Sequence, residues 1–150
     1  MTDVAQPSGD PIMEVRDLVK HFPIRAGFLQ RQVGAAQAVD GISFDVMRGE
    51  TLGLVGESGC GKSTTARLLL RLMVPTAGSI KFDGREIAHI KGSELKALRR
   101  DMQMIFQDPY SSLNPRKTVG SIIADPFVIH RINPEGGRKR AVQELMDTSA

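Results

Sequence analysis

The sequence predicts a mixed α/β fold in which a short strand leads into a glycine-rich loop and then into a helix. Three observations support this prediction. Thr51–Val55 is almost wholly apolar and is followed by glycine, a pattern typical of a strand covered on both faces. Gly56 to Ser63 reads GESGCGKS, a full match to the phosphate-binding pattern G-x-x-x-x-G-K-[ST]. From Lys62 to Met73, apolar residues recur at helical spacing.

Length and composition predict one globular unit. The chain has 150 residues, of which 41% are hydrophobic, enough for a single core. Its formal net charge of +3 is typical of an ordinary solvated surface, and we expect no nucleic-acid partner. Cys60 is the only cysteine, which excludes an internal disulfide and fits a reducing compartment. No apolar run approaches the length of a membrane-spanning helix, and the start lacks the features of a signal peptide.

The residues before the glycine-rich loop predict a leader and two strands. Residues 1–11 are polar and contain proline and glycine, so we expect a flexible leader. Ile12–Phe22 is compatible with a half-buried strand, and Val39–Val46 alternates in part between apolar and polar residues. Between them, Arg25–Gln37 has no clear period and is interpreted as a loop or a hairpin.

The residues after the loop predict further helices and short strands. Pro75 and Gly78 end the first helix, which begins at Lys62. Beyond Gln107 the chain becomes loop-like before two final helices. The expected elements in this half are a strand over Ile80–Phe82, a helix over Ser93–Arg100, a strand over Met102–Phe106, and helices over Val119–His130 and Pro134–Met146.

The glycine-rich loop is the strongest functional signal in the chain. Its glycines let successive backbone N–H groups point at a phosphate, and the helix that follows presents its positive end. Lys62 can reach the β- and γ-phosphates of a nucleotide, and the Ser63 hydroxyl can ligate Mg²⁺. The alternative is a simple glycine-rich turn with a surface lysine. The predicted nucleotide-binding residues of this loop are Gly56, Glu57, Ser58, Gly59, Cys60, Gly61, Lys62, Ser63 and Thr64.

Cys60 has two interpretations. It is a small residue that fits the loop, or it is a redox-active thiol whose pKa the neighbouring N–H groups and Lys62 would lower. The first interpretation is favoured.

Three segments resemble one known family. GESGCGKSTTARLLLRL is similar to the Walker A segment of ATP-binding subunits of ABC transporters, and MIFQDPYSSLNPR is similar to their Q-loop in its oligopeptide and dipeptide importer form. VGSIIADPFVIH resembles the stretch that follows in such importers. The resemblance covers almost everything after Ile12. It implies a P-loop NTPase fold of the ABC type with a mixed sheet, incomplete at its C-terminal side.

The resemblance also implies roles for individual residues. Gln107 corresponds to the Q-loop glutamine, which contacts Mg²⁺ and the attacking water, so Lys62 and Gln107 are the expected catalytic residues. Asp108–Arg116 corresponds to the segment that meets the membrane subunit. Phe22 matches the aromatic position that stacks on adenine, although a core residue at a strand end is the alternative. Residues 12–107 would then form the front of the ATP-binding core, and residues 108–150 the Q-loop and the start of a helical subdomain.

The family implies a function and a set of partners. An ATPase of this kind uses ATP and Mg²⁺ to drive uptake of oligopeptides or dipeptides, with nickel and glutathione as alternative cargoes. Its partners would be transmembrane permease subunits, a second ATP-binding subunit that is identical or different, and, indirectly, an extracytoplasmic peptide-binding protein. The subunit would lie peripherally on the cytoplasmic face of the bacterial inner membrane.

The chain ends at Ala150, before the family's signature, its Walker B strand and its switch histidine. We therefore expect a truncated copy of a longer subunit, one that binds ATP without turnover. Loss of the Walker B strand would expose an apolar edge around Thr51–Val55. The alternative functions are a non-catalytic nucleotide-binding fragment and a small P-loop kinase, although a kinase would not predict FQDPYSSLNP.

Overall fold

The computed structural model describes residues 9–26, 31–106, 108 and 113–148. These residues divide into two compact units, Met1–Ala97 and Leu98–Ala150. The elements are β1 (Pro11–Ala26), β2 (Arg31–Met47), α1 (Lys62–Leu69), β3 (Ala77–Phe82), β4 (Arg85–Glu86), α2 (Gly92–Asp101), α4 (Val119–Ile129) and α5 (Arg138–Thr148).

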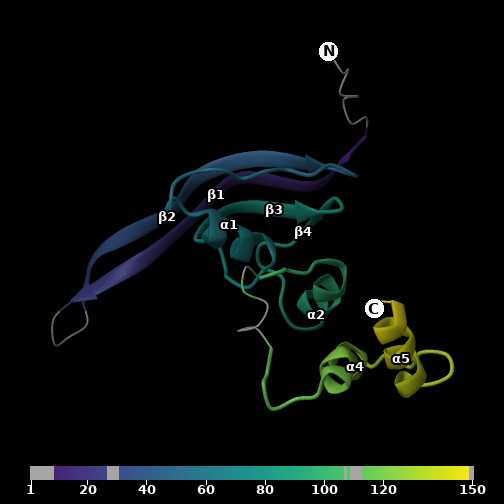
Figure 1. Ribbon diagram of the computed structural model, residues 1–150. Helices are drawn as coiled ribbons and strands as arrows, with labels where there is room; N and C mark the ends of the chain where they lie inside the picture. The colour runs from purple at the N-terminus through teal and green to yellow at the C-terminus, as the bar shows by residue number, and fades with distance from the viewer. Residues whose placement is uncertain (1–8, 27–30, 107, 109–112, 149–150) are drawn as a thin grey trace. The chain divides into compact units, whose positions relative to one another are not determined.

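A four-stranded antiparallel sheet organises the first unit (Figure 1). Its order is β2-β1-β3-β4, so β1 pairs on both sides. The pairing of β1 with β3 ends at Val19, whereas the pairing with β2 continues to Ala26. Beyond Val19 the first two strands therefore run on as a two-stranded arm (Figure 1). The strands predicted over Ile12–Phe22, Val39–Val46 and Ile80–Phe82 are confirmed. The segment interpreted as a loop or a hairpin is described at 25–26 and 31–37, where it belongs to the paired strands β1 and β2, and its residues 27–30 lie outside the described residues.

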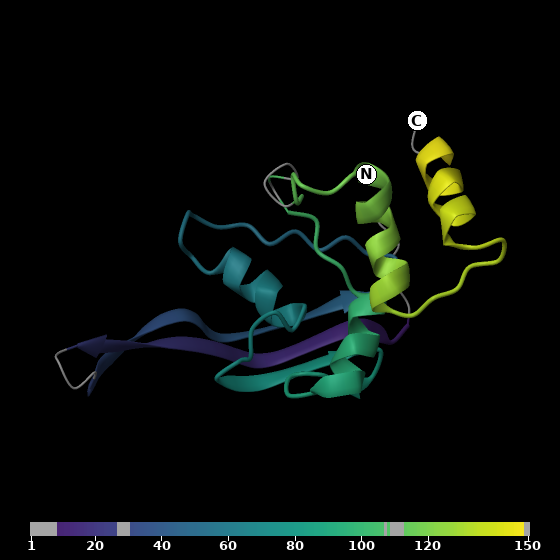
Figure 2. The same ribbon diagram turned by 90° about the horizontal axis from the view of Figure 1, so that it is seen from below.

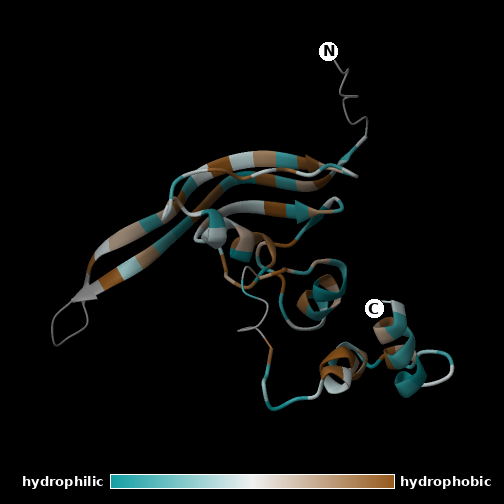
Figure 3. Cartoon of the chain, in the orientation of Figure 1, coloured by the Kyte–Doolittle hydropathy of each residue, from teal (hydrophilic) through white to brown (hydrophobic). Residues whose placement is uncertain are grey.

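The core of this unit lies between the sheet and the segments that follow α1. Among the described residues, the largest side chains that are less than 2% exposed come from β1, α1, β3 and the residue after β4: Val15, Leu18, Leu68, Ile80 and Ile87. Apolar bands along the strands and on α1 can be followed in Figure 3. The helix predicted from Lys62 begins there but ends at Leu69, four residues before Met73.

A β-bulge at Asp17 lets Val15 and Leu18 both enter the core. Asp17 has a φ of 46°, and the register between β1 and β2 shifts between Val15 and Leu18. The Asp17 N–H donates to Ser43 Oγ at 2.8 Å. Gly78 on β3 lies so close that a Cβ there would be 2.3 Å from the Asp17 carbonyl oxygen. The bulge thus needs a glycine on the neighbouring strand.

Two predicted strands are wrong. Thr51–Val55 has no regular secondary structure, and Leu52, Leu54 and Val55 are 44%, 49% and 89% exposed. Met102–Phe106 has none either, with Ile105 96% exposed. A strand exists only where a neighbour accepts its backbone hydrogen bonds, and none of the four strands in the described residues pairs with either segment. The apolar side chains that we expected to be exposed around Thr51–Val55 are exposed, although in an irregular segment and not along a strand edge.

The second unit holds α4 and α5, which lie side by side (Figure 2). Thr118 caps α4, since its Oγ1 accepts a hydrogen bond from the Ser121 N–H at 3.3 Å. The last helix begins at Arg138 and not at Pro134, because Gly136 and Gly137 both have positive φ and a turn closes from Gly137 N–H to Pro134 O at 3.0 Å. No residue of either helix is buried.

Candidate functional site

The glycine-rich loop packs directly against β2. Gly61 has a φ of 95°, and a Cβ at this position would lie 2.2 Å from the carbonyl oxygen of Ala38. Only glycine fits this combination of left-handed backbone and close approach. Gly59, with a φ of 84°, also needs a left-handed conformation but has open space around it. The loop is therefore held in place by a contact with β2 as well as by its own turns.

The first turn of α1 offers free backbone donors at the end of this loop. Gly61 is the N-cap, with no side-chain hydrogen bond, and its carbonyl accepts the first helical bond from Thr65 N–H at 2.8 Å. Helix geometry leaves the N–H groups of Lys62, Ser63 and Thr64 without an acceptor within the helix. Together with the helix dipole, such groups form a site for an anion.

Lys62 is anchored by the loop that precedes it. Its Nζ donates to Gly56 O at 2.7 Å and to Glu57 O at 2.6 Å, and lies 3.5 Å from Cys60 Sγ. An ammonium group has three donors, and a thiol is a weak acceptor. Two strong bonds thus fix the position of the charge, while the third donor faces a group that a phosphate oxygen would readily replace.

A cavity of about 280 Å³ lies next to this lysine. Val39 and Thr65 are buried in its wall, whereas Gln37, Asp40 and Cys60 are exposed. Its lining comes from β2, from the segment before the loop, and from the loop with the start of α1: Gln37, Ala38, Val39, Asp40, Ile42, Leu54, Val55, Cys60, Lys62 and Thr65.

The predicted adenine-stacking residue is not in this lining. Phe22 is 38% exposed, and the Lys20 Nζ lies 5.2 Å from the centre of its ring. The same ammonium donates to Val74 O at 2.8 Å. One face of the Phe22 ring therefore carries a cation, and stacking on a base remains a prediction.

The structure brings the predicted loop residues together with Lys62, Ser63 and Thr64 at one end of α1. Gln107 lies outside the described residues. Within the described ranges no cluster of histidine, cysteine and carboxylate side chains could hold a metal ion by itself. Ser63 is exposed in the first turn of α1, where its hydroxyl can join phosphate oxygens around Mg²⁺.

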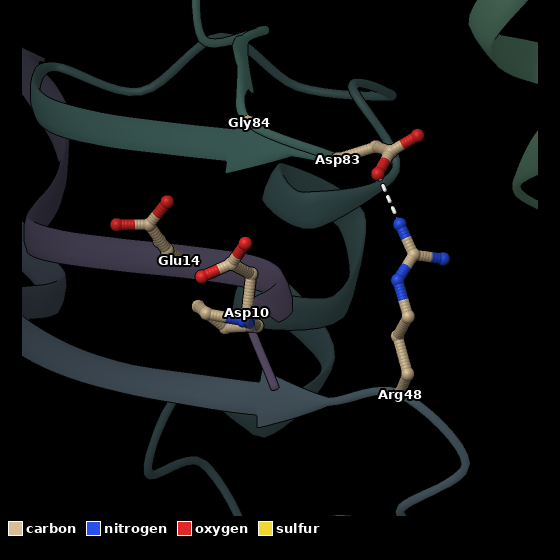
Figure 4. A pocket seen from close by; sticks show the side chains of 6 residues that line it. Asp10, Glu14, Arg48, Asp83 and Gly84 are labelled. Carbon is tan, nitrogen blue, oxygen red and sulfur yellow. Dashed lines mark hydrogen bonds and ion pairs between the residues drawn. The ribbon is translucent and has the colours of Figure 1, made fainter. Parts of the chain in front are cut away.

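A second cavity, of about 460 Å³, lies where β1 begins and β3 ends (Figure 4). Arg48 and Asp83 form an ion pair across its edge. Glu14 lies within 3.9 Å of Arg16 and 4.0 Å of Lys81. These charges are balanced by neighbouring side chains, so we assign this cavity no ligand.

The sequence did not predict that residues of β2 line the first cavity. Asp40 stands 22 positions before Lys62 in a segment whose sequence predicts only a strand. No local pattern marks it, because its nearness to the loop arises from the packing of Gly61 on Ala38.

Comparisons with known proteins agree with this geometry. The family described as "ABC transporter" matches residues 39–149. The chain is 51% identical over 138 residues to the oligopeptide transport ATP-binding protein AppF of Bacillus subtilis, which covers 91% of this chain and 42% of that protein. It is 52% identical over 130 residues to the glutathione import ATP-binding protein GsiA of Pectobacterium atrosepticum, covering 87% of this chain and 21% of that protein.

Among solved structures, the ATP-binding cassette MJ0796, a dimer in a post-hydrolysis state bound to ADP and Pi, superposes with a TM-score of 0.70. The match covers 88% of this chain and 54% of that one at 22% identity, and thus shows the shared fold. The chain spans less than half the length of the two transport proteins that it resembles in sequence.

Proposed function

The chain belongs to the ABC transporter family, and from this premise we propose that it is part of an ATP-binding subunit that couples binding and hydrolysis of Mg·ATP to uptake of oligopeptides or dipeptides. The observation that carries the nucleotide half of the proposal is the anchoring of Lys62 by Gly56 O and Glu57 O beside the free N–H groups of α1. This arrangement can bind a phosphate chain through charge-assisted hydrogen bonds, whereas a neutral ligand would form only weaker hydrogen bonds with it.

Different groups of the loop would contact different parts of the nucleotide. The backbone N–H groups of Gly59 and of residues 61–64 would surround the β-phosphate, and the Lys62 ammonium would neutralise charge on the β- and γ-phosphates. The Ser63 hydroxyl would hold Mg²⁺. When bound, this ion would stabilise the negative charge that develops on the transferred phosphate. Gln107 would orient the attacking water and complete the metal site, and Phe22 would stack on the adenine.

The cargo is proposed from the relatives. AppF is named for oligopeptide transport and GsiA for glutathione import, so a peptide is the first candidate and glutathione, itself a short peptide, is the second. Nickel is the remaining alternative from the Q-loop resemblance. The described residues contain no helix long and apolar enough to span a membrane. From the family resemblance, we assign transport itself to transmembrane permease subunits, which this chain would contact from the cytoplasmic face of the inner membrane.

Two functional regions follow. Residues 12–107 would carry the nucleotide, and residues 108–150, beginning with Asp108–Arg116, would face the permease. The apolar character of α4, brown in Figure 3, with Val119, Val128 and Ile129 all more than half exposed, supports a role in contact with another surface. A second ATP-binding subunit, identical or different, would complete the nucleotide sandwich.

Nucleotide binding by the 150-residue chain tests the first half of the proposal. A fluorescent ATP analogue with Mg²⁺ should bind, and Lys62→Ala should weaken binding about 30-fold or more, because it removes a charge-assisted contact to two phosphates. Lys91→Ala, which removes a lysine outside the site, is the matched control. Equal binding by the Lys62→Ala and Lys91→Ala variants would overturn the assignment. We expect no phosphate release from the 150-residue chain, whereas turnover that depends on Lys62 would point to a self-contained P-loop enzyme.

Growth tests the cargo. A strain lacking the gene should fail to grow on a peptide as its sole source of a required amino acid, while growth on the free amino acid is unaffected. Unchanged peptide uptake with lost glutathione or nickel uptake would move the cargo to that alternative. If no uptake changes, the chain acts as a nucleotide-binding fragment without a transport role.

A further inference from the structure

The cavity beside Lys62 carries opposite charges. Lys62 contributes a cation, while Asp40 and Gln37 on β2 contribute a carboxylate and an amide to the same lining. A carboxylate repels phosphate, so the part of a ligand that reaches Asp40 cannot be the phosphate chain. A group that offers hydrogen-bond donors fits there instead, and the donors that a nucleotide carries are neutral.

Asp40 is oriented by a neighbour from β1. The Oδ1 of Asp40 lies 3.3 Å from the Nε2 of His21, and the side chain of Asp40 is 64% exposed. This contact restrains the carboxylate and occupies one of its oxygens. Since an ionised carboxylate has acceptor sites on both oxygens, Oδ2 is available to a ligand in the cavity.

The remaining lining decides which donor fits. Beside Asp40 stand the apolar side chains of Val39, Ile42, Leu54 and Val55. A nucleoside presents such a mixture, because its sugar combines an apolar ring face with two vicinal hydroxyl donors and is joined directly to the phosphates. If the phosphates bind at Lys62, the sugar is the neutral part of the nucleotide that lies next to them.

We propose that Asp40, oriented by His21, accepts a hydrogen bond from the ribose hydroxyls of the nucleotide and makes the site selective for ribonucleotides. The inference rests on the nucleotide site proposed above and adds a sugar-reading residue to it. Phe22 plays no part in it, because its ring lies outside the cavity lining.

Binding of three probes tests the proposal: ATP, 2′,3′-dideoxy-ATP and inorganic pyrophosphate, each with Mg²⁺. The unaltered chain should bind ATP about tenfold more tightly than the dideoxy analogue, the size expected for a hydrogen bond to a charged acceptor. Asp40→Ala should reduce this ratio to about one, and Asp40→Asn, which keeps a neutral acceptor, should give an intermediate ratio. Pyrophosphate affinity should not fall in either variant, because pyrophosphate has no sugar.

Asp45→Asn is the matched control, since it neutralises another carboxylate on β2 that is not in the lining, and it should leave the ratio unchanged. A ratio near one in the unaltered chain, or a ratio that Asp40→Ala leaves intact, would overturn the sugar assignment. If ATP and pyrophosphate still bind and both depend on Lys62, the proposed nucleotide site stands without it. If neither binds, the nucleotide site fails and the sugar assignment fails with it.

Discussion

Gly61 shows how a single residue connects the phosphate loop to the sheet. Gly61→Ala would place a Cβ 2.2 Å from the Ala38 carbonyl oxygen at a φ of 95°, so loop and strand must separate. We expect a loss of about 2 to 4 kcal/mol in the free energy of unfolding, from left-handed strain and the clash together, with loss of ATP binding. Urea denaturation measures the first effect.

Gly59→Ala separates the two causes. Gly59 has a similar φ of 84°, but a Cβ added there would meet no atom within 4 Å, so only the strain of about 1 to 2 kcal/mol should appear. Equal destabilisation by the two substitutions would show that the contact between Gly61 and Ala38 contributes nothing.

The ion pair of Asp45 with Arg16 makes the stability of the fold depend on pH in the acid range. Arg16 donates to both carboxylate oxygens of Asp45, at 2.5 and 2.9 Å, and this hydrogen bonding lowers the pKa of Asp45 below its ordinary value of 3.8. Because the folded-state pKa is below the unfolded-state pKa, the pair stabilises the fold above about pH 4 and loses this effect as the pH falls through the folded-state value. Asp45→Asn should therefore flatten the fall of Tm below pH 4.

Thermal unfolding between pH 2.5 and 7 checks this expectation. Asp10→Asn, which changes an exposed carboxylate outside the pair, serves as the control and should keep the slope of the unaltered chain. The account is wrong if the Asp45→Asn variant loses stability in acid as steeply as the unaltered chain does.

At the scale of elements, Arg71 joins the end of the phosphate-site helix to the turn after β4. Arg71 is 5% exposed, and its guanidinium donates to Ile87 O at 2.6 Å, to Ile90 O at 3.1 Å and to Met73 O at 3.1 Å. Arg71→Met would keep the length of the side chain but leave carbonyl groups in this region without their donors. We expect a loss of about 2 to 4 kcal/mol in the free energy of unfolding.

The exposed Arg67 on the same helix is the control, since Arg67→Met should change the free energy of unfolding by less than about 0.5 kcal/mol. Denaturant unfolding compares the two variants. Similar values for both would mean that the bonds of Arg71 do not hold the end of α1 in place.

At the scale of the whole molecule, the chain leaves large apolar side chains in water. Val55 is 89% exposed and lies in the segment that the sequence predicts to be a strand. Such a segment offers unpaired backbone groups and apolar surface to other copies. The 150-residue chain should therefore self-associate as its concentration rises, and Val55→Lys should shift it toward the monomer in light scattering coupled to size exclusion.

Thr51→Lys separates charge from apolar surface, since it adds the same charge to the segment without removing a large apolar group. If both variants dissociate equally, electrostatic repulsion alone explains the effect. A wild-type chain that stays monomeric at about 100 µM would remove the basis of the prediction.

The sequence by itself determined the phosphate loop, the start of α1 at Lys62 and, in part, three strands of the antiparallel sheet, while β4 and the first half of β2 were not predicted. These features depend on local conformation: glycine permits the loop, apolar spacing specifies the helix, and alternating or apolar runs mark the strands. The family could likewise be predicted from the sequence, because the residues of each motif are contiguous along the chain.

Only the tertiary structure decided that Thr51–Val55 lacks a strand partner, that Asp17 bulges toward Gly78, and that Asp40 shares a cavity with Lys62. Each of these depends on a residue many positions away. An apolar pattern states that a segment can form a strand, but a strand forms only when another segment accepts its hydrogen bonds. Pairing and close approach are properties of the packed chain, which no local pattern records.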